Sequence, residues 1–340
     1  MTASADVQAA VDKLAGSLAH PVLIEDPRHR PLWWSAQGEV DGTRMRSIMQ
    51  REVSPAAIAV VARLGLARAK GPVRTPAVPE AEMLPRWCVP LRVSGELHGY
   101  LWVLNADGLV TEADLPQLVA CADLAAASLA ESRAREDRDQ RRTALLARLE
   151  AGSDEAAAHE LIALEELDPE ATVAVQAEGA RGGWRLRSGM SAHVNPSARA
   201  TATSGSPVPL ADLHVAVQRA TATLQALRAG AVLSRPSWDA LGAWRLIVAA
   251  PPDLAVADVH PGADVLTRQA RPDLMITART VLDLGGDVSQ AAADLHIHRT
   301  TLYYRLERIE ALTGVNLKSG PGRDDLQMAL RLAAYRLAAD

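Results

Sequence analysis

One segment near the end of the chain limits its possible folds more than any other: residues 287–308 read DVSQAAADLHIHRTTLYYRLER. Asp287 is a good helix N-cap, and Gln290 follows three residues later as in a capping box. His296 stands at a turn where Gly is common, so it needs a positive φ or a slightly different turn. Apolar residues recur at helical spacing before that turn, at Ala291, Ala292 and Leu295. The pattern predicts two short helices joined by a tight turn.

The second predicted helix has two distinct faces. Its N-cap is His298 or Thr300, and Leu302, Leu306 and Ile309 repeat at a spacing that buries one face. Polar and aromatic side chains cover the opposite face: Arg299, Thr301, Tyr303, Tyr304, Arg305 and Arg308. Arg side chains pair with guanine or phosphate, and hydroxyls suit phosphates or bases. The pattern therefore indicates a helix-turn-helix DNA reader, with an ordinary helical hairpin and a solvated basic face as the alternative.

The runs HIHRTTLYYRLERIEALTGVNL and DDLQMALRLAAYRL resemble the C-terminal module of PucR/CdaR-type bacterial transcription factors. The signature of that module is close to H-R-N-T-L-x-Y-R-L-x-R-I-x-x-x-T-G, and Thr300 stands here where Asn is usual. The segment is also similar to the helix-turn-helix of the factor for inversion stimulation. This resemblance implies that His298, Arg299 and Thr301 are the foremost contacts to DNA. The whole expected DNA-binding set is His298, Arg299, Thr300, Thr301, Tyr303, Tyr304, Arg305 and Arg308.

The 340 residues predict two or three domains. We expect a multidomain α+β protein with an N-terminal GAF-like α/β sensor, a long linker helix, a degenerate GGDEF-like α/β middle domain and an all-α C-terminal helix-turn-helix. The expected ranges are 1–130, 131–152, 153–265 and 266–340.

The first range reads as an α+β module. A helix is expected at Val7–Leu18, two more near Gly42–Arg51 and Pro55–Ala69, and strands at Val22–Asp26, Leu32–Ser35, Trp87–Val93 and Leu97–Asn105. Ser94-Gly95-Glu96 is a hairpin signal between the last two strands. The run from CVPLRVSGELHGYLWVLNADGL to DLAAASLA resembles the last strands and final helix of GAF domains, which implies a sensor of small molecules or signals.

Aromatic residues are concentrated in this range, where the chain has Trp and no Phe. We expect an effector pocket lined by Trp33, Trp34, Arg86, Trp87, Cys88, His98 and Trp102. The alternative is that these Trp side chains fill a core otherwise made of Ala, Val and Leu. No cluster of ligands surrounds Cys88 and His98, so a metal or redox role is disfavoured.

The central part of the chain predicts one long helix and a small α/β unit. The helix covers residues 112 to about 150, and Asp154 caps the next helix, Glu155–Leu167. A further helix is expected at Leu210–Ala229, with strands at Thr172–Gln176, Trp184–Arg187 and Leu246–Ala249. The resemblance implies a degenerate relative of GGDEF domains, but the signature motif and an acidic pair for metal are missing from the sequence. We expect no catalytic residue, no cofactor and no metal.

Charge and composition restrict the partners. The net charge is −5, and residues 271–340 hold nine Arg or Lys against nine Asp or Glu. DNA affinity comes mainly from cationic contacts to phosphate, so one copy should bind weakly and a homo-oligomer is expected. Two cysteines are too few for a disulfide framework, and no segment reads as a signal peptide or membrane span, so we expect a cytoplasmic protein.

Three functions remain open on the sequence alone. The first is a ligand-responsive transcription factor with double-stranded DNA and a small-molecule effector as partners. The second is an enzyme related to nucleotide cyclases or phosphodiesterases, against which the missing acidic motif argues. The third is an adaptor whose helical C-terminus binds protein, which the balanced charge of residues 271–340 keeps open.

Overall fold

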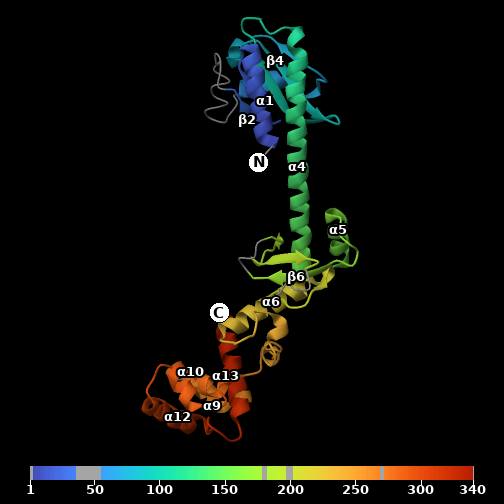
Figure 1. Cartoon of the computed structure of the whole chain (residues 1–340). Coiled ribbons are helices and arrows are strands. Elements are labelled where there is room, and N and C mark those ends of the chain that lie inside the picture. Colours follow the sequence, from blue (N-terminus) through green and yellow to red (C-terminus); the bar gives the residue numbers. More distant parts are fainter. Residues whose placement is uncertain (1–2, 36–54, 178–181, 197–201, 269–271, 340) are drawn as a thin grey trace. The chain divides into compact units, whose positions relative to one another are not determined.

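The computed structural model describes residues 3–35, 55–177, 182–196, 202–268 and 272–339. It divides into two compact units, Met1–Gln140 and Arg141–Asp340 (Figure 1). The helix expected near Gly42–Arg51 lies outside the described residues. The structure is a mixed α+β fold with a long helix and a helical C-terminal region, as the sequence predicts. The four domain ranges stay predictions.

The first unit is built on a five-stranded antiparallel sheet of order β2-β1-β5-β4-β3. Its elements are α1 (Ala3–Leu18), β1 (Val22–Glu25), β2 (Pro31–Trp34), α3 (Pro55–Arg63), β3 (Val73–Thr75), β4 (Arg86–Val93), β5 (Glu96–Leu104) and the start of α4 (Leu115–Ala151). Ser94 and Gly95 form the turn between β4 and β5 with φ of 49° and 86°. A two-residue loop with both φ positive matches the twist of the strands, which confirms the predicted hairpin.

The two faces of this sheet have different partners. Helices α1 and α4 cover one face, where apolar side chains such as Val11, Ile24 and Leu118 form the main core. The other face carries a smaller cluster around Cys88 and Trp102. Because successive residues of a strand point to opposite faces, neighbours in the sequence contribute to different clusters.

The predicted long helix is confirmed as α4, which begins in the first unit and ends in the second. Thr111 and Asp114 form a capping box on the short 3-10 turn that leads into it. Its first half packs in the first core, Leu145, Leu146 and Leu149 enter the second core, and residues 131–141 are exposed. Among the described residues, Glu112–Ala151 is long and apolar enough to cross a membrane by length and composition alone, but its apolar half packs on the sheet.

The second unit begins with a small α/β layer. It contains α5 (Glu155–Glu165), a four-stranded sheet of order β7-β8-β6-β9 and α6 (Leu213–Arg228). The strands are β6 (Thr172–Gln176), β7 (Trp184–Arg185), β8 (Ser191–Val194) and β9 (Val208–Pro209). Asp154 caps α5 as predicted, with its carboxylate accepting from the Ala157 amide at 2.9 Å.

The strand predicted at Leu246–Ala249 is wrong, because this segment belongs to helix α7 (Trp244–Val248). Trp244 and Ile247, three residues apart, are buried on one side, and Leu246 is exposed. A short apolar run fits both a buried strand and a buried helix, so its periodicity could not decide between them. Here the side chains pack with α6 and the C-terminal helix in one cluster.

Within the described part of the chain, six further helices complete the second unit. They are α8 (Val256–Val259), α9 (Pro261–Arg268), α10 (Pro272–Asp283), α11 (Val288–Asp294), α12 (Arg299–Thr313) and α13 (Arg323–Leu337). Buried residues of α9 to α13 share one core. The crossing of α9 and α12 is close at Gly262, where an added Cβ would lie 2.5 Å from the Thr313 Cα.

We predict that Gly262→Ala destabilises the second unit by about 1–3 kcal/mol, because the methyl group would push α9 away from α12. Thermal unfolding followed by circular dichroism measures the change. Gly152→Ala is the control: an added Cβ there meets nothing within 4 Å. Equal melting temperatures for the two variants would contradict the close crossing.

Candidate DNA-binding site

The first helix of the candidate motif, α11, is fixed by its N-cap. The Asp287 carboxylate accepts from the amides of Ser289 and Gln290 at 2.9 and 3.0 Å. The reciprocal half of the predicted capping box does not form: the Gln290 amide donates to Asp294 instead, and the Asp287 N–H donates to the Leu284 carbonyl. The N-terminus of α11 is therefore capped without the full box.

The turn after α11 has the strained backbone that its sequence requires. His296 has a φ of 53°, in the left-handed region where Gly is preferred. The amides of His296 and Ile297 donate to the Ala293 and Ala292 carbonyls, which closes the end of α11. The sequence left a positive φ and a slightly different turn as alternatives, and the structure has the first, carried by a residue other than Gly.

The second helix, α12, starts at the other side of the turn. Its N-cap is His298, whose Nδ1 accepts from the Thr300 amide at 3.3 Å and lies 2.8 Å from the Thr300 hydroxyl. The sequence left His298 and Thr300 as alternatives, and the structure selects the first. The imidazole is thus engaged at the helix start, beside the residues expected to meet DNA.

The faces of α12 agree with the predicted pattern. Leu302, Leu306 and Ile309 are buried in the core shared by the C-terminal helices. The exposed side chains expected to contact DNA are Arg299, Thr300, Thr301, Tyr303, Tyr304 and Arg308. Tyr304 is the more accessible of the two tyrosines, with 67 % of its surface exposed. Arg308 makes no hydrogen bond or ion pair with any residue that the structure describes, so its guanidinium is available to a partner.

Arg305 differs from the other expected contacts. Its side chain is only 23 % exposed, and its guanidinium donates to the buried Thr277 hydroxyl of α10 at 3.1 Å. Asp273, one turn earlier on α10, lies 3.9 Å away. These contacts make Arg305 a positioning residue that holds α12 against α10. Sequence spacing alone could not reveal this, because Thr277 lies 28 residues earlier in the sequence.

Two further cations lie at the motif. Arg299 bridges its two helices, donating to the Ser289 hydroxyl at 2.9 Å. Lys318, in the loop after α12, has its ammonium 5.2 Å from the centre of the Tyr303 ring. Lys318 could not be identified from the sequence, since no pattern ties that loop to the start of α12.

Three other cations of the C-terminal region are engaged within the protein. Arg279 donates to the Ala229 carbonyl at the end of α6, and burial lowers its pKa. Arg331 pairs with Asp283 at 2.7 Å, and Arg336 donates to the Pro251 carbonyl. Among the residues that the structure describes, the exposed cations of α12 and of the loop after it are Arg299, Arg308 and Lys318.

The predicted effector residues are divided between the two faces of the first sheet. Trp33 and Trp87 belong to the core under α1 and α4, where their indole N–H groups donate to Ser4 Oγ and the Val110 carbonyl. The others lie elsewhere: Trp34, Arg86, Cys88, His98 and Trp102. Of these, Cys88 and Trp102 share the cluster on the opposite face, and the Arg86 guanidinium lies 5.9 Å from the Trp102 ring. The structure therefore does not bring the seven residues into one pocket.

A buried polar group that the sequence analysis missed adjoins Trp102. Glu25 Oε1 lies 2.5 Å from His29 Nδ1 and accepts from the Trp102 indole at 2.8 Å. His29 stacks on Tyr100, with ring centres 5.3 Å apart. In the sequence, the one sign of this group is that an acidic residue, Glu25, ends an apolar strand. That Glu25 pairs with Tyr100 is known only from the sheet register.

The Cys88 thiol lies on the same sheet face as this polar group. Burial raises the pKa of the Cys88 thiol well above its ordinary value, and the Glu25 charge adds to the shift. A thiol held protonated is a poor nucleophile and a poor metal ligand. Within the described ranges, no group of three or more His, Cys, Asp or Glu side chains is placed to hold a metal ion.

Residues 274–332 match the family model of the PucR C-terminal helix-turn-helix domain. The match covers most of α10, all of α11 and α12, and the larger part of α13. No curated protein matches the chain. The family match supports a PucR-type, DNA-binding transcription regulator, and it falls on the helices whose geometry is described above.

We predict that Arg305→Met lowers the stability of the second unit by about 1–2 kcal/mol, because a half-buried hydrogen bond from a charged group is lost. Arg308→Met, on the exposed side of the same helix, should change it by less than about 0.5 kcal/mol. Urea unfolding of the full chain compares the two. Equal stability of the two variants would place Arg305 among the surface contacts after all.

Proposed function

We propose that this protein is a ligand-responsive transcriptional regulator that reads operator DNA through α11 and α12. The observation that carries the proposal is the exposed N-terminal half of α12, which falls within the family match. Helix-turn-helix proteins place the second helix of the motif in the major groove, with its first residues against base edges. The protein would act in the cytoplasm, where its DNA is.

The side chains of α12 suit different parts of the duplex. Thr300, Thr301 and Tyr304 offer hydroxyls toward bases or phosphates, and Arg308 can form two hydrogen bonds with guanine. Arg299 and Lys318, at the margin of the motif, suit phosphates. His298 contacts DNA as a neighbour of Thr300, and Arg305 acts through the position of α12. Tyr303, stacked under Lys318, completes the surface.

The low net charge of this surface supports a homo-oligomer as the DNA-binding form. Glu307 and Glu310 are exposed on α12 together with Arg308, so the helix itself has little net positive charge. Few phosphate contacts mean weak and strongly salt-dependent binding by one copy. Two copies on a repeated site gain affinity because the second contact is intramolecular. We therefore propose a homo-oligomer, dimer or higher.

The first unit would supply the signal. Its five-stranded antiparallel sheet with helices on one face supports a GAF-like sensor of a small molecule. The middle layer, with its small sheet and α6, supports a degenerate GGDEF-like domain without catalysis. An effector would act by shifting the conformations of α4, the helix shared by both units. Saturating effector that leaves DNA affinity and oligomeric state unchanged would contradict this coupling.

We predict that the full-length protein selects a repeated half-site from random DNA. Arg299→Ala and Arg308→Ala should each weaken binding to the selected site. Each should also reduce the slope of log affinity against log salt by about 1 if its guanidinium contacts phosphate. Fluorescence anisotropy over a salt series measures both quantities.

Arg187→Ala is the matched control, since Arg187 is exposed in the second unit outside the motif and should leave affinity and slope unchanged. Selection of no DNA, together with retained folding, would favour the adaptor, which the balanced charge of residues 271–340 supports.

A further inference from the structure

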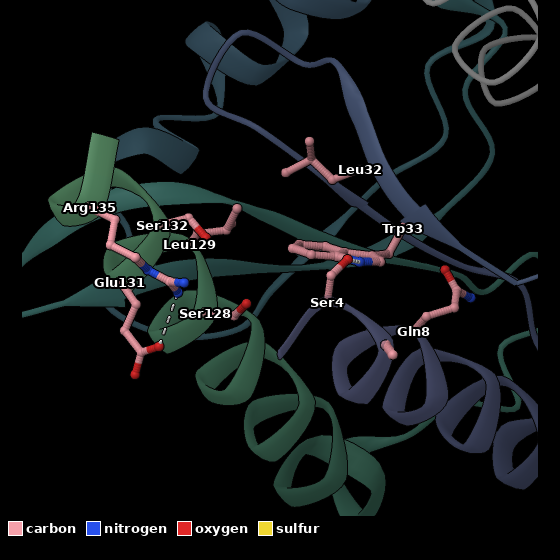
Figure 2. A pocket seen from close by; sticks show the side chains of 10 residues that line it. Ser4, Gln8, Leu32, Trp33, Ser128, Leu129, Glu131, Ser132 and Arg135 are labelled. Atoms are coloured by element: carbon pink, nitrogen blue, oxygen red, sulfur yellow. Dashed lines mark hydrogen bonds and ion pairs between the residues drawn. The ribbon is translucent and has the colours of Figure 1, made fainter. Parts of the chain in front are cut away.

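A groove of about 910 Å³ lies in the first unit between α1, β2 and the first half of α4 (Figure 2). Its volume falls in the range that holds small organic ligands. It lies on the sheet face covered by α1 and α4, opposite the cluster around Trp102. It is therefore separate from most of the residues expected to bind an effector.

The bottom of the groove is apolar. Leu32, Trp33 and Leu129 line it and are at most partly exposed. The Trp33 indole N–H already donates to Ser4 Oγ at 3.2 Å. Trp33 therefore offers a ligand its ring surface and no further donor, which suits a flat apolar group.

One polar side chain in the groove lacks a partner. Ser128 on α4 is only 8 % exposed, and its hydroxyl makes no hydrogen bond to any residue that the structure describes. Serines inside helices often bond the carbonyl one turn earlier, but this one does not. Figure 2 shows Ser128 on the side of α4 that faces α1. This hydroxyl is therefore free to donate to a ligand oxygen in the groove.

Two features of the groove can hold an anion, the N-terminus of α1 and Arg135. Ser4 and Ala5, in the first turn of α1, line it at the positive end of the helix dipole, and Asp6 of the same turn is exposed. Arg135 lies on α4, and its Nη2 is 3.7 Å from Glu131 Oε2 (Figure 2). Both side chains are more than two-thirds exposed, so this ion pair is weak and Arg135 can turn to a ligand.

We propose that this groove binds a small organic acid. Its apolar body would lie on Trp33 and Leu129, and its carboxylate would meet Ser128, Arg135 and the start of α1. The inference rests on the proposed function, because it gives the sensing unit its ligand class and the position of its site. A bound acid bridges α1 and α4, and α4 is the helix that continues into the second unit.

The test uses 2-naphthoate, with its neutral amide 2-naphthamide as the matched probe of equal shape. Isothermal titration calorimetry on the full-length protein should show binding of the acid, and binding of the amide at least about tenfold weaker, since a charge-assisted contact is lost. Arg135→Gln should weaken the acid severalfold and leave the amide unchanged, and Ser128→Ala should weaken the acid severalfold. Arg133→Gln is the control, since Arg133 lies two residues away, pairs with Glu96 and does not line the groove.

Equal affinities for acid and amide, acid binding unchanged in Arg135→Gln and Ser128→Ala, or no binding of the acid would each overturn the proposal. A loss of acid binding in a Trp102→Leu variant alone would place the ligand on the opposite sheet face. DNA binding of the same preparations is measured in parallel. If DNA binding persists while the acid fails to bind, the groove proposal fails and the regulator stands; if DNA binding is absent, the proposed function itself fails.

Discussion

The seating of α12 on α10 is the contact on which the candidate DNA-binding surface depends. Leu302, Leu306 and Ile309 provide the apolar part of it, and Arg305 adds a directional hydrogen bond to Thr277. Apolar packing fixes the distance between two helices but leaves rotation about the helix axis less defined. A guanidinium held between Thr277 and Asp273 restricts that rotation, and with it the direction in which Thr300 and Tyr304 point.

The local parts of the motif could be predicted from sequence because each depends on a few neighbouring residues. Asp287 as N-cap, the positive φ of His296 and the buried face of α12 all follow from chain chemistry within one or two turns. The hairpin at Ser94 and Gly95 belongs to the same class. These are features that the rest of the fold does not have to override.

What could not be predicted depends on partners distant in sequence. The segment at 246–249 became a helix because its apolar side chains pack with α6 and α13. Arg305 turned inward because Thr277 is beside it. Alternation places Trp33 and Trp34 on opposite faces, but only strand pairing shows that Glu25 stands beside Tyr100 and that α4 closes a groove over Trp33. The residue pattern predicts which face of a helix or strand is buried, but the topology decides which other element packs against that face.

The inward role of Arg305 changes what the motif's signature encodes. Leu302, Arg305, Leu306 and Ile309 are signature positions, and all of them face the protein. The positions at which the signature is open or departs, Tyr303, Glu307 and Thr300, are exposed. The signature also fixes exposed residues that we propose as DNA contacts, namely Arg299, Thr301, Tyr304 and Arg308. It therefore defines the helix packing and part of the DNA-facing surface, and the open positions are where that surface can vary. Regulators that share this scaffold can diverge in the genes they address without altering how the helices pack.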